Sequence, residues 1–212
     1  GGMASVYRGR NLNLDAPVAI KILHSTLASD QSYLARFELE ARTAATIQTP
    51  NIVKVLDFGN ADGEYFIVME LVDGFDMAKV VADLAEATGN SVPMPPEISL
   101  LILEEVAYGL RAAHERGIWH RDVKPSNVML DRQGCVRVAD FGLARDSRRG
   151  QGPDLTRSGV VLGTPSYMSP EQAAGERLDG RTDVFSLGVM AYQWLSGRRP
   201  FPGDSSSEIL RR

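Results

Sequence analysis

The octapeptide HRDVKPSN at residues 120–127 places a carboxylate, an ammonium group and an amide within six residues. Asp122, Lys124 and Asn127 are the groups that phosphoryl transfer requires. They supply an acceptor for a hydroxyl proton, a cation for the moving phosphoryl group and an oxygen ligand for Mg²⁺. An aspartate and a lysine in a loop are more often only solvated charges, so the surrounding sequence decides between the two interpretations.

The tripeptide Asp-Phe-Gly at 140–142 favours the phosphoryl-transfer interpretation. It begins eighteen residues after Asp122, and two short strands over 127–131 and 136–139 are predicted between them. Such strands form a β-hairpin, which would return Asp140 to the neighbourhood of Asn127. Two oxygen donors for a hard cation would then lie side by side.

The segment VAIK at 18–21 predicts a cation on a strand. Side chains alternate between the two faces of a strand, so Ala19 and Lys21 share one face. An amine beside a small residue suits contact with a phosphate below a flat ring, although an exposed lysine on an edge strand fits this segment equally well. Glu40 lies on the apolar side of a predicted helix. A buried carboxylate needs a cation, and Lys21 is the candidate.

The hydrophobic pattern predicts an α+β fold with two lobes. Strands are expected at 4–8, 17–23, 52–58 and 64–71, a first helix after Asp30 as N-cap, and longer helices at 97–116 and 183–196. The last of these is apolar nearly all round, which predicts a buried core helix. We therefore expect a small β-rich lobe with one helix at 1–70, a hinge at 71–75 and a larger, mainly helical lobe at 76–212.

Composition narrows the class of protein. The 212 residues are 43% hydrophobic and 24% charged, with a net charge of −4, which excludes a disordered chain and a strongly basic nucleic-acid surface. No apolar run approaches the length of a membrane helix. The single cysteine, Cys135, fits a reducing compartment, so we expect a cytoplasmic domain. The chain begins with Gly1 rather than Met, as expected for a piece of a longer protein.

Six features occur in a fixed order along the chain, and together they resemble the eukaryotic-type protein kinases, specifically their bacterial Ser/Thr branch. They are GGMASV (1–6), VAIK (18–21), Glu40, HRDVKPSN (120–127), DFG (140–142) and GTPSYMSPE (163–171). No P-loop pattern occurs anywhere in the sequence. The resemblance implies a two-lobed kinase fold with Mg-ATP as cofactor, Mn²⁺ being a possible substitute for Mg²⁺.

The resemblance also assigns roles to the catalytic and metal-binding residues. Asp122 matches the residue that accepts the hydroxyl proton, and Lys124 the lysine on the γ-phosphate. Asn127 and Asp140 match the Mg²⁺ ligands. Lys21 matches the lysine that binds the α- and β-phosphates and pairs with Glu40.

Further positions match the nucleotide pocket, the structural core and the regulatory elements of the family. The nucleotide set comprises Gly1, Gly2, Val6, Ala19, the gatekeeper Met69, the hinge residues Glu70 and Val72, and Met129. Asp183 matches a buried aspartate that holds the catalytic loop, and an apolar spine joins Ala44, Val55, His120 and Phe141. The regulatory set comprises the phosphorylatable Thr156 and Ser158, the phosphate-receiving Arg121 and Arg145, and Thr164, which contacts the catalytic loop.

The sequence departs from the family pattern in three places. The first strand and the first glycine of the glycine-rich loop are missing, and Ala4 stands at its third glycine. The family's Ala-Pro-Glu reads Ser169-Pro170-Glu171. The chain stops before the final helices, so it resembles a domain truncated at both ends. We then expect Glu171 to lack its arginine partner and part of the 183–196 helix to be exposed, giving an aggregation-prone fragment with little activity.

The expected function is transfer of the γ-phosphoryl group of Mg-ATP to Ser or Thr hydroxyls of proteins, with autophosphorylation as control. Pairs of kinase domains could perform that step in trans, and a region outside this chain could anchor the parent protein to a membrane. No nucleic-acid partner is expected. The alternatives are a catalytically dead pseudokinase scaffold and a small-molecule phosphotransferase of related fold.

Overall fold

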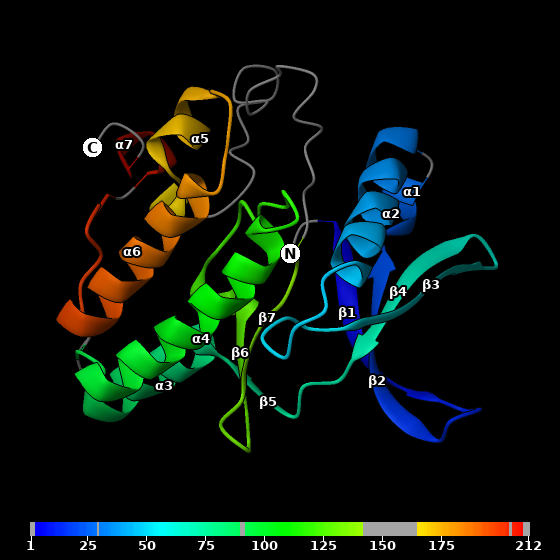
Figure 1. Cartoon of the computed structure of the whole chain (residues 1–212), viewed down its shortest axis with the longest axis horizontal. Helices are drawn as coiled ribbons and strands as arrows, with labels where there is room; N and C mark the ends of the chain where they lie inside the picture. Colours follow the sequence, from blue (N-terminus) through cyan, green and yellow to red (C-terminus); the bar gives the residue numbers. More distant parts are fainter. Residues whose placement is uncertain (1–2, 29, 90–91, 142–164, 204, 210–212) are drawn as a thin grey trace.

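The computed structural model describes residues 3–28, 30–89, 92–141, 165–203 and 205–209. The chain forms an N-terminal portion, built on an antiparallel sheet, and a mainly helical portion (Figure 1). The sheet has the strand order β1-β2-β4-β3. Its strands are β1 (Ala4–Asn11), β2 (Ala16–Leu23), β3 (Val55–Ala61) and β4 (Glu64–Glu70).

The register of this sheet gathers the expected nucleotide residues on one face. Val6 pairs with Lys21, and Ala19 pairs with Met69. Directly opposed residues of antiparallel strands point to the same side, and so do residues two apart on one strand. Val6, Ala19, Lys21 and Met69 therefore lie on a common face, and the prediction from VAIK that Ala19 and Lys21 share a face is confirmed.

Helix α2 (Gln31–Ala45) packs on the sheet and begins where the sequence predicts. The Asp30 side chain accepts a hydrogen bond from the Ser32 N–H, which satisfies one of the free donors of the first turn. Phe37 and Ala41 of α2 are buried with Leu23 and Ile67 of the sheet. A short helix α1 (Ser25–Ala28) precedes α2, so this portion contains one helical turn more than expected.

The prediction of a strand at 52–58 is wrong for its first three residues, because β3 begins only at Val55. Ile52 forms a parallel bridge with Val138, and the Val53 N–H donates to the Val138 carbonyl at 2.9 Å. The Val138 N–H in turn donates to the Asn51 carbonyl at 2.8 Å. Residues 51–53 therefore pair with a strand of the helical portion, which fastens the two portions together.

A second sheet of three short strands lies between the larger sheet and the helices (Figure 1). It consists of β5 (Gly74–Asp76), β6 (Val128–Asp131) and β7 (Val136–Val138), in that order. The last two form the predicted hairpin. Strand β5 falls at the end of the expected hinge. A Cβ at Gly74 would lie 2.0 Å from the Leu130 carbonyl oxygen, so only glycine allows this pairing.

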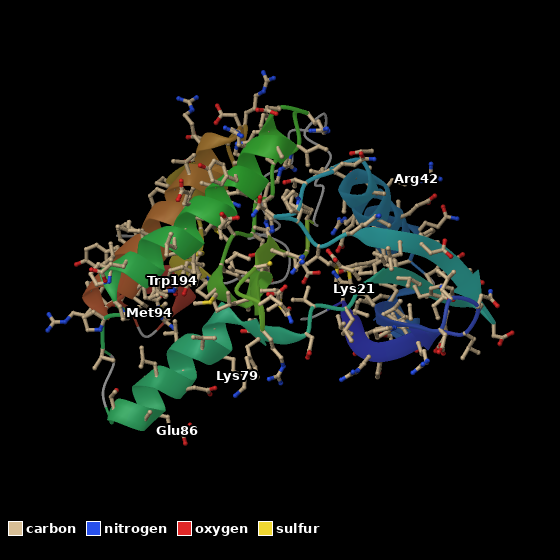
Figure 2. All side chains as sticks on the ribbon, turned by 60° about the horizontal axis from the view of Figure 1, so that its bottom comes forward. Lys21, Arg42, Lys79, Glu86, Met94 and Trp194 are labelled. Atoms are coloured by element: carbon tan, nitrogen blue, oxygen red, sulfur yellow. The ribbon has the colours of Figure 1, made fainter. Side chains whose placement is uncertain are left out.

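The helical portion is built around α4 (Pro96–His114) and α6 (Arg181–Ser196). Val106 and Ala113 of α4 are fully buried in the same core as Met190 and Trp194 of α6. Figure 2 shows Met94, which precedes α4, close to Trp194, and the Met94 N–H donates to the Trp194 carbonyl at 2.7 Å. The other elements are α3 (Met77–Thr88), α5 (Pro170–Ala174), α7 (Ser206–Ile209) and 3₁₀ turns at Pro125–Asn127 and Pro165–Tyr167.

Helix α6 is buried along one side only, so the prediction of a buried core helix holds for that side, and part of the helix is exposed as expected. Thr182, Asp183 and Met190 are buried, whereas Val184 is 61% exposed and Leu195 is 39% exposed. The apolar residues of α6 surround the helix, but α4 covers a single side of it. Across the described ranges, no helix combines the length and the apolar character that crossing a bilayer demands.

Candidate active site

One buried aspartate on α6 accepts backbone hydrogen bonds from the loop that carries HRDVKPSN. Asp183 Oδ2 accepts from the His120 N–H at 2.8 Å, and Oδ1 accepts from the Arg121 N–H at 2.7 Å. His114, in the last turn of α4, places Nε2 at 2.7 Å from Asp183 Oδ2. A fully buried carboxylate requires such donors, and here they fix the loop backbone. The geometry expected of Asp183 is confirmed.

His120 connects this loop to the strand that leads into the DFG segment. Its Nε2–H donates to the Ala139 carbonyl at 2.9 Å, and its Nδ1 accepts from the Asp122 N–H at 3.2 Å. The ring also packs on Phe141, with 4.7 Å between the ring centroids. Since His120 is fully buried, these contacts hold Asp122 and the DFG segment at fixed positions relative to each other.

Asp122, Lys124 and Asn127 converge as the sequence predicts. Lys124 Nζ donates to Asp122 Oδ2 at 2.6 Å. Asn127 Nδ2 lies 2.9 Å from the Asp122 carbonyl oxygen and 3.4 Å from Oδ2. Both contacts of Asn127 use Nδ2, so the amide oxygen is the atom that would serve as a metal ligand.

Lys21 forms the predicted ion pair with Glu40 and a second one with Asp140. Its Nζ lies 2.6 Å from Glu40 Oε1 and 2.9 Å from Asp140 Oδ1. The Lys21 and Glu40 side chains are 14% and 10% exposed, and that of Asp140 is 41% exposed. In Figure 2, Lys21 lies where the sheet meets the helical portion, whereas Arg42 points outward from α2. One ammonium group thus joins β2, α2 and the DFG segment.

Burial and charge shift the pKa values of this triad. Burial lowers the pKa of Lys21, but the carboxylates of Asp140 and Glu40 outweigh it and the net shift is upward. Burial raises the pKa of Glu40 and Lys21 lowers it, and with the added charge of Asp140 the net shift is upward. Burial also raises the pKa of Asp140, yet Lys21 outweighs this effect and the net shift is downward. Asp140 therefore stays ionised, as a metal ligand must be.

The hairpin of β6 and β7 brings Asp140 back to Asn127. The Ala139 N–H donates to the Asn127 carbonyl at 2.8 Å, which makes the residue before Asp140 a direct neighbour of Asn127. Within the part of the chain that the structure describes, no three His, Cys, Asp or Glu side chains cluster closely enough to hold a metal ion. Mg²⁺ commonly takes one or two protein ligands and completes its shell with water and substrate phosphates, and the Asp140 and Asn127 oxygens fit that pattern.

The other nucleotide positions that the structure describes lie on the larger sheet, in the connection that follows it and on β6. Val6, Ala19 and Met69 share the sheet face of Lys21, Glu70 ends β4, and Val72 lies half-buried in the connection to β5. Met129 lies on β6, opposite Asp76 of β5. The expected spine residues Ala44, Val55 and Phe141 line one small cavity together with Met69, Glu40 and Asp140.

Six predicted positions lie outside the described residues: Gly1, Gly2, Arg145, Thr156, Ser158 and Thr164. Arg121 is described, and its backbone has the left-handed φ of 66°. Asp140 also has a positive φ, 56°. Glu171 interacts electrostatically with Arg181, whose guanidinium lies 2.7 Å from Asp179.

Two contacts of the site could not be predicted from the sequence. His114, which supports Asp183, gives no local signal, because a histidine in the last turn of a helix usually serves the helix end. Gln172 donates from Nε2 to the Arg121 carbonyl at 2.6 Å. The pattern Ser169-x-x-Gln172 is a capping box, which could have marked the start of α5, though not this longer contact.

Comparison with known proteins gives consistent matches over the chain. The family model for the protein kinase domain matches residues 1–212. The serine/threonine-protein kinase PknL of Mycobacterium tuberculosis is 42% identical over 209 residues, which cover 99% of this chain and 50% of PknL. PknB of Mycobacterium leprae is 41% identical over 213 residues, which cover 99% of this chain and 33% of PknB.

Solved structures agree with the sequence matches. The crystal structure of the Mycobacterium tuberculosis PknI kinase domain superposes with a TM-score of 0.72 at 32% identity, covering 96% of this chain and 73% of that one. The chain spans about half the length of the curated relative PknL. With the family model matched over residues 1–212 and relatives more than 40% identical, the chain belongs to the protein kinase domain family, among the bacterial Ser/Thr kinases.

Proposed function

We propose that this domain transfers the γ-phosphoryl group of Mg-ATP to Ser or Thr hydroxyls of protein substrates. The observation that carries the proposal is the position of Lys21, bonded to both Glu40 and Asp140. In kinases the lysine on this strand and the glutamate on this helix must pair for activity, and the DFG aspartate must be in place for Mg²⁺. The contacts of Lys21 with Glu40 and Asp140 support the proposal on both points.

In the proposed reaction, Asp122 orients the attacking hydroxyl and receives its proton. The new bond joins the substrate oxygen to the γ-phosphorus, the bond from that phosphorus to the β,γ-bridging oxygen breaks, and ADP leaves with the electron pair. The Lys124 ammonium stabilises the negative charge on the transferred γ-phosphoryl group, and Lys21 binds the α- and β-phosphates. Asn127 and Asp140 would hold Mg²⁺, or Mn²⁺ in its place, and the metal would supply charge neutralisation for the phosphates.

The remaining roles complete the proposal. Adenine would lie between the sheet face and β6, within the set Gly1, Gly2, Val6, Ala19, Met69, Glu70, Val72 and Met129. Residues 1–70 and 76–212 would act as the two lobes, with 71–75 as the hinge. We place the reaction in the cytoplasm. Thr156 and Ser158 would be the sites of controlling phosphorylation, performed by pairs of kinase domains acting in trans. Arg121 and Arg145 would bind the added phosphate, and Thr164 would contact the catalytic loop.

A phosphotransfer assay with labelled Mg-ATP separates this function from the alternatives. We expect labelling of a generic protein acceptor such as myelin basic protein, none of sugars or aminoglycosides, and none with Asp140→Ala. Labelling of small molecules only would favour the small-molecule phosphotransferase. Nucleotide binding without any transfer would favour the pseudokinase scaffold, against which the presence of Lys21, Asp122, Asn127 and Asp140 argues.

A further inference from the structure

We propose that Gln172 is a positioning residue that holds the catalytic loop in its strained form, an inference that rests on the proposed function. The strain lies at Arg121, directly before Asp122. Its φ of 66° is in the left-handed region, which residues other than glycine adopt rarely. Such a conformation persists only where the surrounding structure holds it.

Two side chains form hydrogen bonds with the backbone of Arg121, one with its N–H and one with its carbonyl oxygen. Its N–H donates to Asp183 Oδ1 at 2.7 Å, and its carbonyl oxygen accepts from Gln172 Nε2 at 2.6 Å. That carbonyl belongs to the same planar peptide unit as the Asp122 N–H, which donates to His120 Nδ1 at 3.2 Å. The Gln172 contact therefore fixes the plane from which the Asp122 side chain projects.

The amide of Gln172 is used at both ends, which defines its orientation. Oε1 accepts from the Ser169 N–H at 3.0 Å, and the Ser169 hydroxyl accepts from the Gln172 N–H at 3.3 Å. This capping box would be satisfied equally by glutamate. The Arg121 carbonyl, however, requires a donor, and a carboxylate at that position would set two acceptors against each other. Glutamine alone of the two residues serves both partners.

The segment that carries Gln172 is held to α6 by hydrogen bonds. The buried hydroxyls of Ser169 and Thr182 lie 2.6 Å apart, and Ser186 Oγ donates to the Tyr167 carbonyl at 2.7 Å. Helix α6 also carries Asp183. Both hydrogen bonds to the Arg121 backbone therefore depend on α6: Asp183 belongs to α6 itself, and Gln172 belongs to α5, which is held to α6.

The test compares three substitutions of Gln172 in the full chain with one matched control. Gln172→Glu keeps the cap acceptor and loses the donor, whereas Gln172→Ala and Gln172→Met lose both. Glu176→Gln makes a carboxylate-to-amide exchange at an exposed residue just after α5. We expect kcat to fall by about tenfold or more in all three Gln172 variants, the scale of one hydrogen bond to an otherwise unsatisfied group. KM for ATP should stay within about twofold, and Glu176→Gln should match the wild type.

Two readouts distinguish positioning from simple capping. In Gln172→Glu the new carboxyl group can donate once protonated, so the ratio of its kcat to that of the wild type should rise as the pH falls from 8 to 6. Amide hydrogen exchange across residues 118–124 should accelerate in each Gln172 variant and stay unchanged in Glu176→Gln. The exchange measurement does not require activity, so a wild-type chain without phosphotransfer would refute the proposed function while exchange still decided the role of Gln172.

Wild-type kcat and exchange in Gln172→Glu would overturn the proposal, since that variant lacks only the donor. The same conclusion would follow if Gln172→Ala and Gln172→Met lost activity while Gln172→Glu kept it, because loss of the cap would then explain the effect. If Gln172→Glu did not fold, Gln172→Met and Gln172→Ala would decide in its place, with unchanged exchange across 118–124 counting against the proposal.

Discussion

At the scale of single residues, the site depends on one cation shared by two carboxylates. Lys21 lies 2.6 Å from Glu40 and 2.9 Å from Asp140. Glu40 is buried, and burial already raises its pKa in the presence of Lys21. Without that cation, Glu40 would avoid a buried, unpaired charge by holding a proton.

Replacing Lys21 with methionine should therefore make stability depend on pH. The folded variant would keep a proton on Glu40 at pH values where the unfolded chain, with a glutamate pKa of about 4.3, has lost it. Unfolding free energy then falls as the pH rises. We expect a loss relative to wild type on the order of 3 kcal/mol at pH 8, and a clearly smaller loss at pH 5, by urea unfolding.

Arg42→Met is the matched control, since it breaks an exposed pair with Glu38 at 2.6 Å. Such pairs contribute about 0.2–1 kcal/mol, so its effect should be small and equal at both pH values. Equal losses at pH 5 and pH 8 in Lys21→Met would show that Glu40 does not depend on Lys21 for its charge.

At the scale of elements, the segment 51–53 joins the sheet portion to the helical portion. Asn51 is bonded to β7 through its carbonyl and to Glu105 of α4 through its side-chain amide. Helix α4 can approach this closely because it carries Gly109. A Cβ there would lie 2.9 Å from the Asn51 carbonyl oxygen.

Gly109→Ala should accordingly push α4 away from this segment. We expect overpacking to cost about 1–3 kcal/mol, offset in part by the gain of about 0.5–1 kcal/mol from replacing a helical glycine with alanine. Gly188→Ala on α6 is the control, since no atom lies within 4 Å of its added Cβ, and it should stabilise the protein. Thermal melting measures both variants, and a Gly109→Ala protein as stable as Gly188→Ala would refute the close contact.

The segment between Asp140 and Glu171 carries the proposed switch. A phosphate adds about −1.5 to −2 charges and can order a loop through arginine. Replacing both Thr156 and Ser158 with alanine should lower activity about tenfold or more, with phosphorylation mapped by mass spectrometry in the wild type. Unchanged activity of the double variant in the full-length parent would exclude the switch.

Local chemistry is what the sequence predicted well. Asp30 caps its own helix, and VAIK alternates on its own strand, so both could be predicted from neighbouring residues. The Lys21–Glu40 pair also followed, because a carboxylate on an apolar face needs a cation. The start of β3 did not, since residues 52–54 are diverted by pairing with β7. Neither did the contact of Gln172, whose partner Arg121 lies 51 positions away in the sequence.

At the scale of the whole molecule, the proposed reaction requires both portions at once. Lys21 belongs to the sheet portion, Asp122 and Asp140 belong to the helical portion, and Lys21 bridges to Asp140 across the junction. The chain crosses between the portions at 71–73, and 51–53 pairs across the same junction. Nucleotide binding should therefore depend on the junction, whereas transfer should depend in addition on Asp122.

Asp122→Asn tests this account most directly, measured for both nucleotide binding and phosphotransfer. A positioned general base contributes about 10²–10⁴-fold to rate. We predict that the variant keeps the wild-type melting-temperature shift with Mg-ADP and loses at least about a hundredfold in kcat towards a protein acceptor. A variant that folds, binds nucleotide and keeps more than about half of wild-type kcat would contradict the assignment of Asp122 and the proposed mechanism.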